Sequence, residues 1–188
     1  MAPSALRLFA IIGCAFAMAC ADSAEYARLS VDGNALVPDC AADAFPFEPT
    51  FLSAKTHQGR TGIFLQSPRD VYHRTDVALI QFYDDAISDG TSVELAAGTD
   101  PGATARAKLA FFSSCPDELE TLELRGTIEI DQFDPGDGYI TGRLLDGYAV
   151  DARTAQTVID SISGSWHLRV RRGVPHQDFF ALPEADSN

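Results

Sequence analysis

Apolar and polar residues alternate along several short stretches of the chain, which is the pattern of β-strands with one buried face. The clearest stretches are residues 105–111, 122–130 and 162–170, and in each of them the charged side chains fall on a single face. Residues 77–83 are apolar on both faces, which predicts a strand covered on both sides. No stretch keeps a helical period over several turns. The pattern therefore predicts an all-β protein.

Turn signals recur at short intervals between these stretches. Glycine-containing turn sequences occur at residues 32–34, 58–59, 89–90, 100–102, 134–136, 146–147 and 172–173. Frequent turns between short alternating runs are typical of an antiparallel sandwich or barrel, and we expect an antiparallel β-sandwich of about eight or nine strands. Within this pattern, Asp146-Gly147 predicts a two-residue hairpin turn.

Residues 41–55 are rich in aromatic residues and proline but do not alternate, which leaves two interpretations open. The residues concerned are Phe45, Pro46, Phe47, Pro49 and Phe51. They form either a loop held to the core by its aromatic rings or an exposed aromatic platform for a ligand. Near the C-terminus, Phe179 and Phe180 are expected to dock the tail, because adjacent phenylalanines seldom stay exposed.

The first 19 residues have the three parts of a secretory signal peptide. Arg7 lies near the start, an apolar run covers residues 8–19, and small residues end the run. This run fits the core of a signal peptide and is shorter than the ~20 apolar residues that a permanent membrane-spanning helix needs. We therefore expect the protein to be exported from the cytoplasm.

The apolar run ends in Phe16-Ala17-Met18-Ala19-Cys20, which resembles the lipobox of bacterial lipoproteins. The resemblance implies that Cys20 starts the mature chain and carries lipid, palmitate included, which anchors it in an envelope membrane facing the periplasm or the cell surface. The alternative is ordinary cleavage at the small residues around Ala19, which gives a freely secreted protein. Residues 1–19 are thus the signal peptide, residues 20–25 a lipidated tether and residues 26–188 a single domain.

Two further cysteines, Cys40 and Cys115, remain in the mature chain. Export places them in an oxidising compartment, where an even pair of cysteines favours a disulfide. Neither a Cys-x-x-Cys redox spacing nor the additional ligands of a zinc site accompanies them. We expect them to be joined.

The chain is acidic, with a formal net charge of −13 at pH 7. Loss of residues 1–19 removes only Arg7 among the charged residues and leaves 13 Lys and Arg against 27 Asp and Glu, a charge of −14. Such a surface repels phosphate backbones, so we expect no nucleic acid as a partner. The main effect of this charge is expected to be solubility.

A glycine-containing loop holds three carboxylates, Asp131, Asp134 and Asp137. They are a weak candidate for a metal site, because oxygen ligands suit a hard cation but their spacing matches no calcium loop. The interpretation that we prefer is a polar turn capped by Asp134, with positive φ at Gly136 and Gly138. We expect no cofactor and no resident metal.

The chain has four histidines as candidate bases or zinc ligands: His57, His73, His167 and His176. None has a partner at the spacing of a His-Glu-x-x-His helix, and no Gly-x-Ser-x-Gly nucleophile motif occurs. We expect each to be a surface or hydrogen-bonding residue.

A small basic patch ends the last predicted strand, at Arg169, Arg171 and Arg172. Arg169 and Arg171 project to the same face, where an acidic partner or carboxylates of the same domain could meet them. In so acidic a chain we expect the pairing to be internal.

These observations favour a non-catalytic role, as an envelope module that binds an unidentified protein or glycan or has a structural function. The alternatives are an exported enzyme of the hydrolase class and a carrier that holds a small ligand inside a barrel-like cavity. A pocket where a histidine meets a carboxylate would favour the enzyme, a hollow apolar interior the carrier, and a filled core the binding module.

Overall fold

A computed structural model describes most of the region after the predicted tether. The described residues are 24–32, 45–67, 75–83, 85–98, 100–114 and 121–176. The predicted signal peptide, Cys20, Cys40, Cys115, His73, Phe179 and Phe180 lie outside them. The described residues form β-strands and no helix, so the all-β prediction is confirmed.

The described residues contain nine strands, within the predicted number of eight or nine. They are β1 (Tyr26–Val31), β2 (Phe51–His57), β3 (Arg60–Ser67), β4 (Asp76–Phe82), β5 (Thr91–Leu95), β6 (Ala105–Phe111), β7 (Thr121–Phe133), β8 (Tyr139–Asp151) and β9 (Thr157–Arg172). The alternating stretches at 105–111, 122–130 and 162–170 all lie in strands, with their apolar faces inward.

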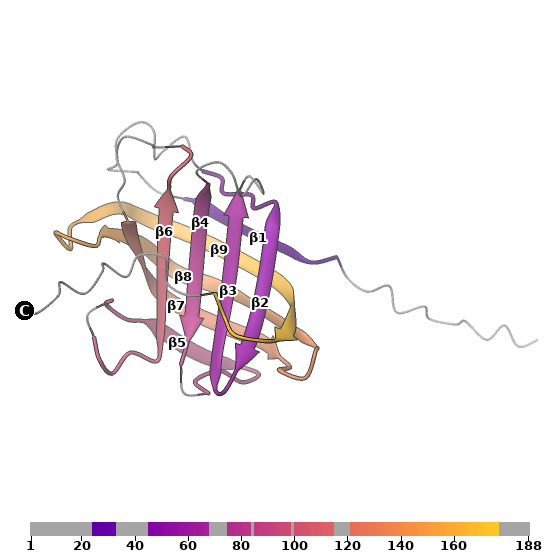
Figure 1. The fold of residues 1–188 in the computed structure, drawn as a ribbon. Helices are drawn as coiled ribbons and strands as arrows, with labels where there is room; N and C mark the ends of the chain where they lie inside the picture. The colour runs from indigo at the N-terminus through magenta and orange to yellow at the C-terminus, as the bar shows by residue number, and fades with distance from the viewer. Residues whose placement is uncertain are drawn as a thin grey trace, which may run out of the picture.

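Seven of the strands close into a barrel, so the predicted sandwich is wrong. The closed path runs from β9 through β2, β3, β4, β6, β7 and β8 back to β9. Figure 1 shows β2, β3, β4 and β6 as a front layer, with β9, β8 and β7 crossing behind them. Below, the front layer means these four strands.

Closure depends on the length of β7 and β9, because each pairs with different strands along its length. Residues 121–124 of β7 pair with β6, whereas residues 126–130 pair with β5. Residues 162–167 of β9 pair with β1, whereas residues 170–172 run parallel to β2. β1 and β5 therefore extend the back layer while the far ends of β7 and β9 join it to the front layer.

The predicted hairpin at Asp146-Gly147 is also wrong, because β8 continues through both residues. The pairing of β8 with β9 changes register around Gly147, and the pairing with β7 changes register around Gly126. Asp146 has φ 49° and Gly126 has φ 122°. These are the features of β-bulges, which bend long strands, so the Asp-Gly pair bends a strand here and does not end one.

The interior of the barrel is filled by side chains. Trp166, Phe82 and Leu109 are each at most 2% exposed and belong to one apolar cluster that spans the strands. A barrel of about eight strands is just wide enough for its own side chains. The seven-stranded barrel of this protein is filled by apolar side chains in this way.

A second, smaller apolar cluster lies on the outer surface of the front layer. It consists of Phe64, Val77 and Leu79, with Phe51 packed against it. Residues 77–83 are therefore apolar on both faces because β4 contacts the barrel core on one side and this cluster on the other.

The aromatic residues before β2 hold their segment to the barrel, as the first of the two interpretations predicts. Phe47 is 4% exposed and forms a β-bridge with Leu29. The ring of Phe45 packs edge-on against Phe111, with centroids 5.6 Å apart. These rings are therefore part of the core and leave no exposed platform at Phe45 and Phe47.

Candidate functional site

Charged residues are distributed unequally over the barrel. The front-layer strands contain four cations, Lys55, Arg60, Arg106 and Lys108, and one carboxylate, Asp76. Asp76 is the first residue of β4, and its side chain accepts hydrogen bonds from the backbone N–H groups of Ser113 and Ser114. In a chain with a net charge of −13, the outer face of this layer is locally positive.

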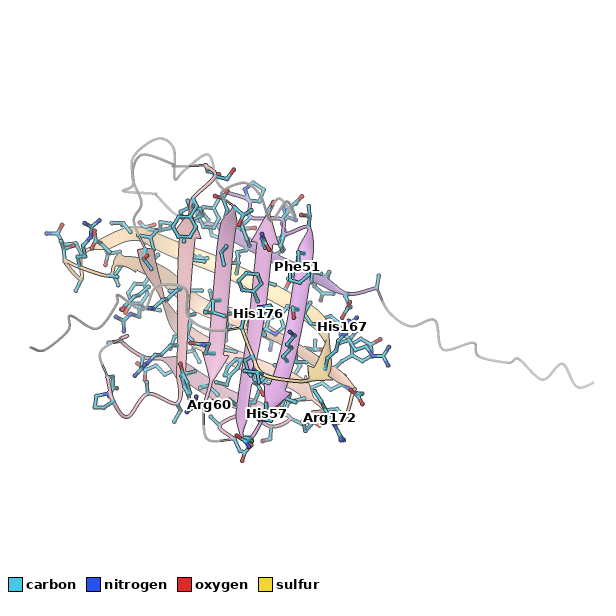
Figure 2. All side chains as sticks on the ribbon, viewed as in Figure 1. Phe51, His57, Arg60, His167, Arg172 and His176 are labelled. Atoms are coloured by element: carbon cyan, nitrogen blue, oxygen red, sulfur yellow. The ribbon has the colours of Figure 1, made fainter. Side chains whose placement is uncertain are left out.

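A cleft of about 830 Å³ opens on this positive face. Its lining includes His57, Arg60, Tyr83, Arg106 and His176. Figure 2 labels His57, Arg60 and His176, which all lie at the front layer. Among the described residues that line the cleft there is no carboxylate.

Two arginines lie over the ring of Tyr83 in the cleft. The Cζ atom of Arg60 is 5.9 Å from the ring centroid, and the Cζ atom of Arg106 is 5.7 Å from it. They come from β3 and β6, the two neighbours of β4, so they approach the tyrosine from both sides. Cation–π contacts hold a guanidinium in place while leaving its N–H groups able to donate.

Neither arginine forms an ion pair with a described residue. Arg106 donates one hydrogen bond to the backbone carbonyl of Asp100. An arginine that is not neutralised internally can pair with an external carboxylate, phosphate or sulfate through two parallel hydrogen bonds. The two guanidiniums therefore give the cleft the chemistry of an anion site.

Buried unpaired nitrogen atoms point to the same cleft. Across the described residues, four buried side-chain nitrogens have no hydrogen-bond partner, and two of them are Arg106 Nε and His176 Nε2. A buried polar atom without a partner costs free energy, so each such atom calls for a reason. Two of the four residues that carry such an atom, Arg106 and His176, line the cleft.

The chain after β9 crosses the front layer and forms one wall of the cleft. We call residues 173–176 the strap. The backbone N–H of Gly173 donates to the Thr56 carbonyl over 3.0 Å, and Gln81 Nε2 donates to the His176 carbonyl over 3.4 Å. A Cβ at Gly62 would lie 2.8 Å from Pro175, so only glycine at this position leaves room for the strap.

His176 packs flat on the outer apolar cluster. Its ring stacks on Phe64 with centroids 4.4 Å apart. Burial lowers the pKa of His176 from its ordinary value, and the positive charge of Lys55 lowers it further. Both effects favour the neutral imidazole, which has one donor and one acceptor nitrogen.

The other described histidines are divided between the two layers. His57 lines the cleft, where it joins His176 although the two are far apart in sequence. His167 lies on β9, where its ring stacks on Tyr139 at 4.5 Å and its Nδ1 is 2.7 Å from Thr141 Oγ1. The prediction of a hydrogen-bonding role is confirmed for His167.

The three aspartates of the predicted polar turn do not form a common site. Asp134 accepts a hydrogen bond from the backbone of Gly136 over 2.7 Å, whereas Asp131 lies 3.9 Å from Arg143. The described part of the chain holds no group of three or more acidic, histidine or cysteine residues placed to bind a metal ion. The cap by Asp134 is confirmed, but positive φ falls on Asp137, at 74°, and not on Gly136 or Gly138. An aspartate tolerates this conformation, so the turn does not need glycine for it.

The basic patch at the end of β9 shows no internal ion pair within the described part of the chain. Arg169, Arg171 and Arg172 form no ion pair with the described residues. Arg171 instead pairs in register with Lys55 of β2, which places two cations side by side. The patch therefore continues the positive charge of the front layer.

The fold and the site together define a closed all-β barrel with a basic cleft on its outer face. No family model, curated protein or solved structure matches the chain. Within the described residues, no helix has the length and hydropathy of a membrane span.

Proposed function

We propose that this protein is an exported, non-catalytic binding module of the cell envelope, and that its cleft binds an anionic ligand. The observation that carries the proposal is the pair Arg60 and Arg106 over Tyr83, with no carboxylate among the described lining residues. Because the rest of the protein is strongly acidic, two cations that form no ion pair with a described residue support an external anion as their partner.

The chemistry of the lining favours binding over catalysis. The cleft contains His57 and His176, but the described lining has no serine, cysteine or carboxylate to act with them as nucleophile or orienting group. Its one threonine, Thr61, is 4% exposed and donates its hydroxyl hydrogen to Thr56. The groups that remain are hydrogen-bond donors and aromatic rings, which suit recognition.

Titration of the mature protein with citrate, phosphate and digalacturonate, followed by amide NMR shifts, tests the cleft. We expect shifts around Arg60, Tyr83 and Arg106. Replacing both arginines by glutamine should weaken binding at least about tenfold, since one charged hydrogen bond contributes about 1.5–3 kcal/mol.

The charge-matched control is the double variant Arg28→Gln with Arg143→Gln. These arginines pair with Glu48 and Glu129 and lie on β1 and β8, outside the front layer. The control should bind like the wild type. The proposal would be contradicted if none of the three anions shifted the amide signals of cleft residues. It would also be contradicted if both double variants lost the same amount of binding affinity.

The anchor is the second part of the proposal and is supported by the sequence before Cys20. Expressed in a bacterium that processes lipoproteins, the wild type should partition into the membrane fraction with a mass that includes lipid on Cys20. Cys20→Ser should be unlipidated and soluble, while Cys14→Ser should behave like the wild type because Cys14 is removed with the signal peptide. If the wild type is unacylated and cleaved at another residue, the anchor is ruled out and the protein is freely secreted.

A further inference from the structure

The strap is bonded to the front layer at both of its ends. At one end the backbone N–H of Gly173 donates to Thr56, and at the other the carbonyl of His176 accepts from Gln81. Between these ends Val174 is 62% exposed, so its side chain adds little to the binding of the strap. The strap therefore has few contacts with the sheet, and several of them belong to His176.

The imidazole of His176 lies in an apolar site on the outer apolar cluster. It stacks on Phe64 and meets the ring of Phe51 edge-on, with centroids 6.4 Å apart. Its Nε2 atom is buried and has no hydrogen-bond partner among the described residues. Figure 2 shows His176 lying over the front layer, with Phe51 nearby. A neutral ring suits this site, because a protonated one would bring a buried charge and a second N–H donor without an acceptor for it.

The charged and titratable groups around His176 oppose its protonation. Burial, and after it the positive charge of Lys55, lowers the pKa of His176. No carboxylate lines the cleft among its described residues, and Asp85 lies outside the lining, against Gly59 in the β2–β3 turn. Asp76 accepts hydrogen bonds from Ser113 and Ser114 at the start of β4. The charged and titratable groups that the packed elements contribute on this side are Lys55 and His57 of β2, Arg60 of β3, Tyr83 after β4, and Arg106 and Lys108 of β6.

We propose that His176 is a pH-sensitive latch: the strap stays docked while the imidazole is neutral and is released when the imidazole is protonated. Release removes one wall of the cleft and uncovers Phe64, which is 6% exposed under the docked strap. Attraction between a cationic ring and Phe64 offsets only part of the cost of protonation, because a phenyl ring does not replace a hydrogen-bond acceptor. The release of the strap needs no ligand, whereas its effect on the cleft rests on the proposed anion binding.

The docked strap is expected to weaken as the pH falls. Docking is strongest above the ordinary histidine pKa of 6.5, because only the released His176 takes up a proton readily as the pH drops below that value. Each pH unit between the pKa of the released His176 and that of the docked His176 lowers the docking equilibrium constant by up to about tenfold. Below the pKa of the docked form, docking weakens no further through this group.

NMR of the mature protein without ligand, from pH 7.5 to 5.0, tests the latch. At pH 7.5 we expect NOEs between the rings of His176 and Phe64 and a protected Gly173 amide, with protection measured relative to the intrinsic exchange rate. Both should weaken towards pH 5.0. His176→Phe keeps an aromatic ring on Phe64 and cannot be protonated, so its Gly173 amide should stay protected at pH 5.0. The matched control His57→Phe removes the other histidine of the cleft and should release the strap like the wild type.

Several results would overturn the latch. One is a His176 pKa of 6.5 or higher, and another is a Gly173 amide as protected at pH 5.0 as at pH 7.5. Loss of Gly173 protection at pH 5.0 in His176→Phe would also do so, because release would then not need protonation of His176. Loss of protection throughout the barrel at pH 5.0 would count against it too, since the latch frees the strap alone.

Binding of citrate and phosphate at pH 7.5 separates the latch from the anion cleft. If the strap is released as expected but neither anion binds, the latch stands and the proposed function fails. If the anions bind in the cleft but the strap stays docked at pH 5.0, the proposed function stands and the latch is overturned.

Discussion

Replacing Gly126 by alanine is expected to lower the free energy of unfolding by about 2 to 6 kcal/mol, the sum of backbone strain and overpacking. Gly126 has φ 122°, a backbone conformation that residues with a Cβ rarely adopt. The added Cβ would also lie 2.8 Å from the carbonyl oxygen of Leu145 and 2.9 Å from the Cα of Gly147. Both contacts are with backbone, so no side chain can move to relieve them.

The position of Gly126 makes this cost a test of the barrel itself. It lies where β7 changes partner from β6 to β5 and faces the bulge in β8. Gly102→Ala is the matched control, because its Cβ would meet only the Asp100 side chain at 3.5 Å. Urea unfolding of the mature protein measures both. Equal stability of Gly126→Ala and Gly102→Ala would show that β7 and β8 do not approach each other as described.

Reduction of the exported protein is expected to destabilise it strongly, because we predict a disulfide between Cys40 and Cys115. Both cysteines lie outside the described residues, but their neighbours in sequence meet: Phe45 packs against Phe111 with ring centroids 5.6 Å apart. Closing a loop of roughly 75 residues stabilises by about 4.5 kcal/mol in the simplest chain-entropy model, an upper value where the bond is strained. A domain with a total stability of about 5–15 kcal/mol would lose much of it.

Thermal unfolding with and without reductant measures this effect. Cys40→Ser, Cys115→Ser and the double variant should have the same lowered melting temperature, because each removes the same bond. The double variant should not respond further to reductant, which controls for other effects of the reagent. Two free thiols in the unreduced, denatured mature protein would rule out the disulfide.

Strand positions could be predicted from sequence because side-chain alternation is a local property. Residues 105–111 and 162–170 alternate and are strands with the expected inner faces. Closure into a barrel could not be predicted, since a sandwich and a barrel need the same alternation. The barrel closes because residues 170–172 of β9 pair with β2. These two segments are more than 100 residues apart in the chain, so no local pattern predicts their pairing.

The Asp146-Gly147 pair shows the same limit at a single turn. The dipeptide accepts positive φ, which both a hairpin and a bulge use. Which of the two forms depends on the strands alongside it. Here β7 and β9 flank β8 on both sides and continue past the dipeptide, so β8 bends and does not reverse.

The sequence by itself determined that the protein is all-β and acidic, and that its cations include Arg106 and Lys108 on one face of a single strand. Residues 51–67 also contain no aspartate or glutamate. Only the tertiary structure brought Arg60 and Arg106 to the two sides of Tyr83 and laid the strap beside them. Charge and alternation are properties of neighbouring residues, whereas a cleft requires strand pairing between segments that are tens of residues apart.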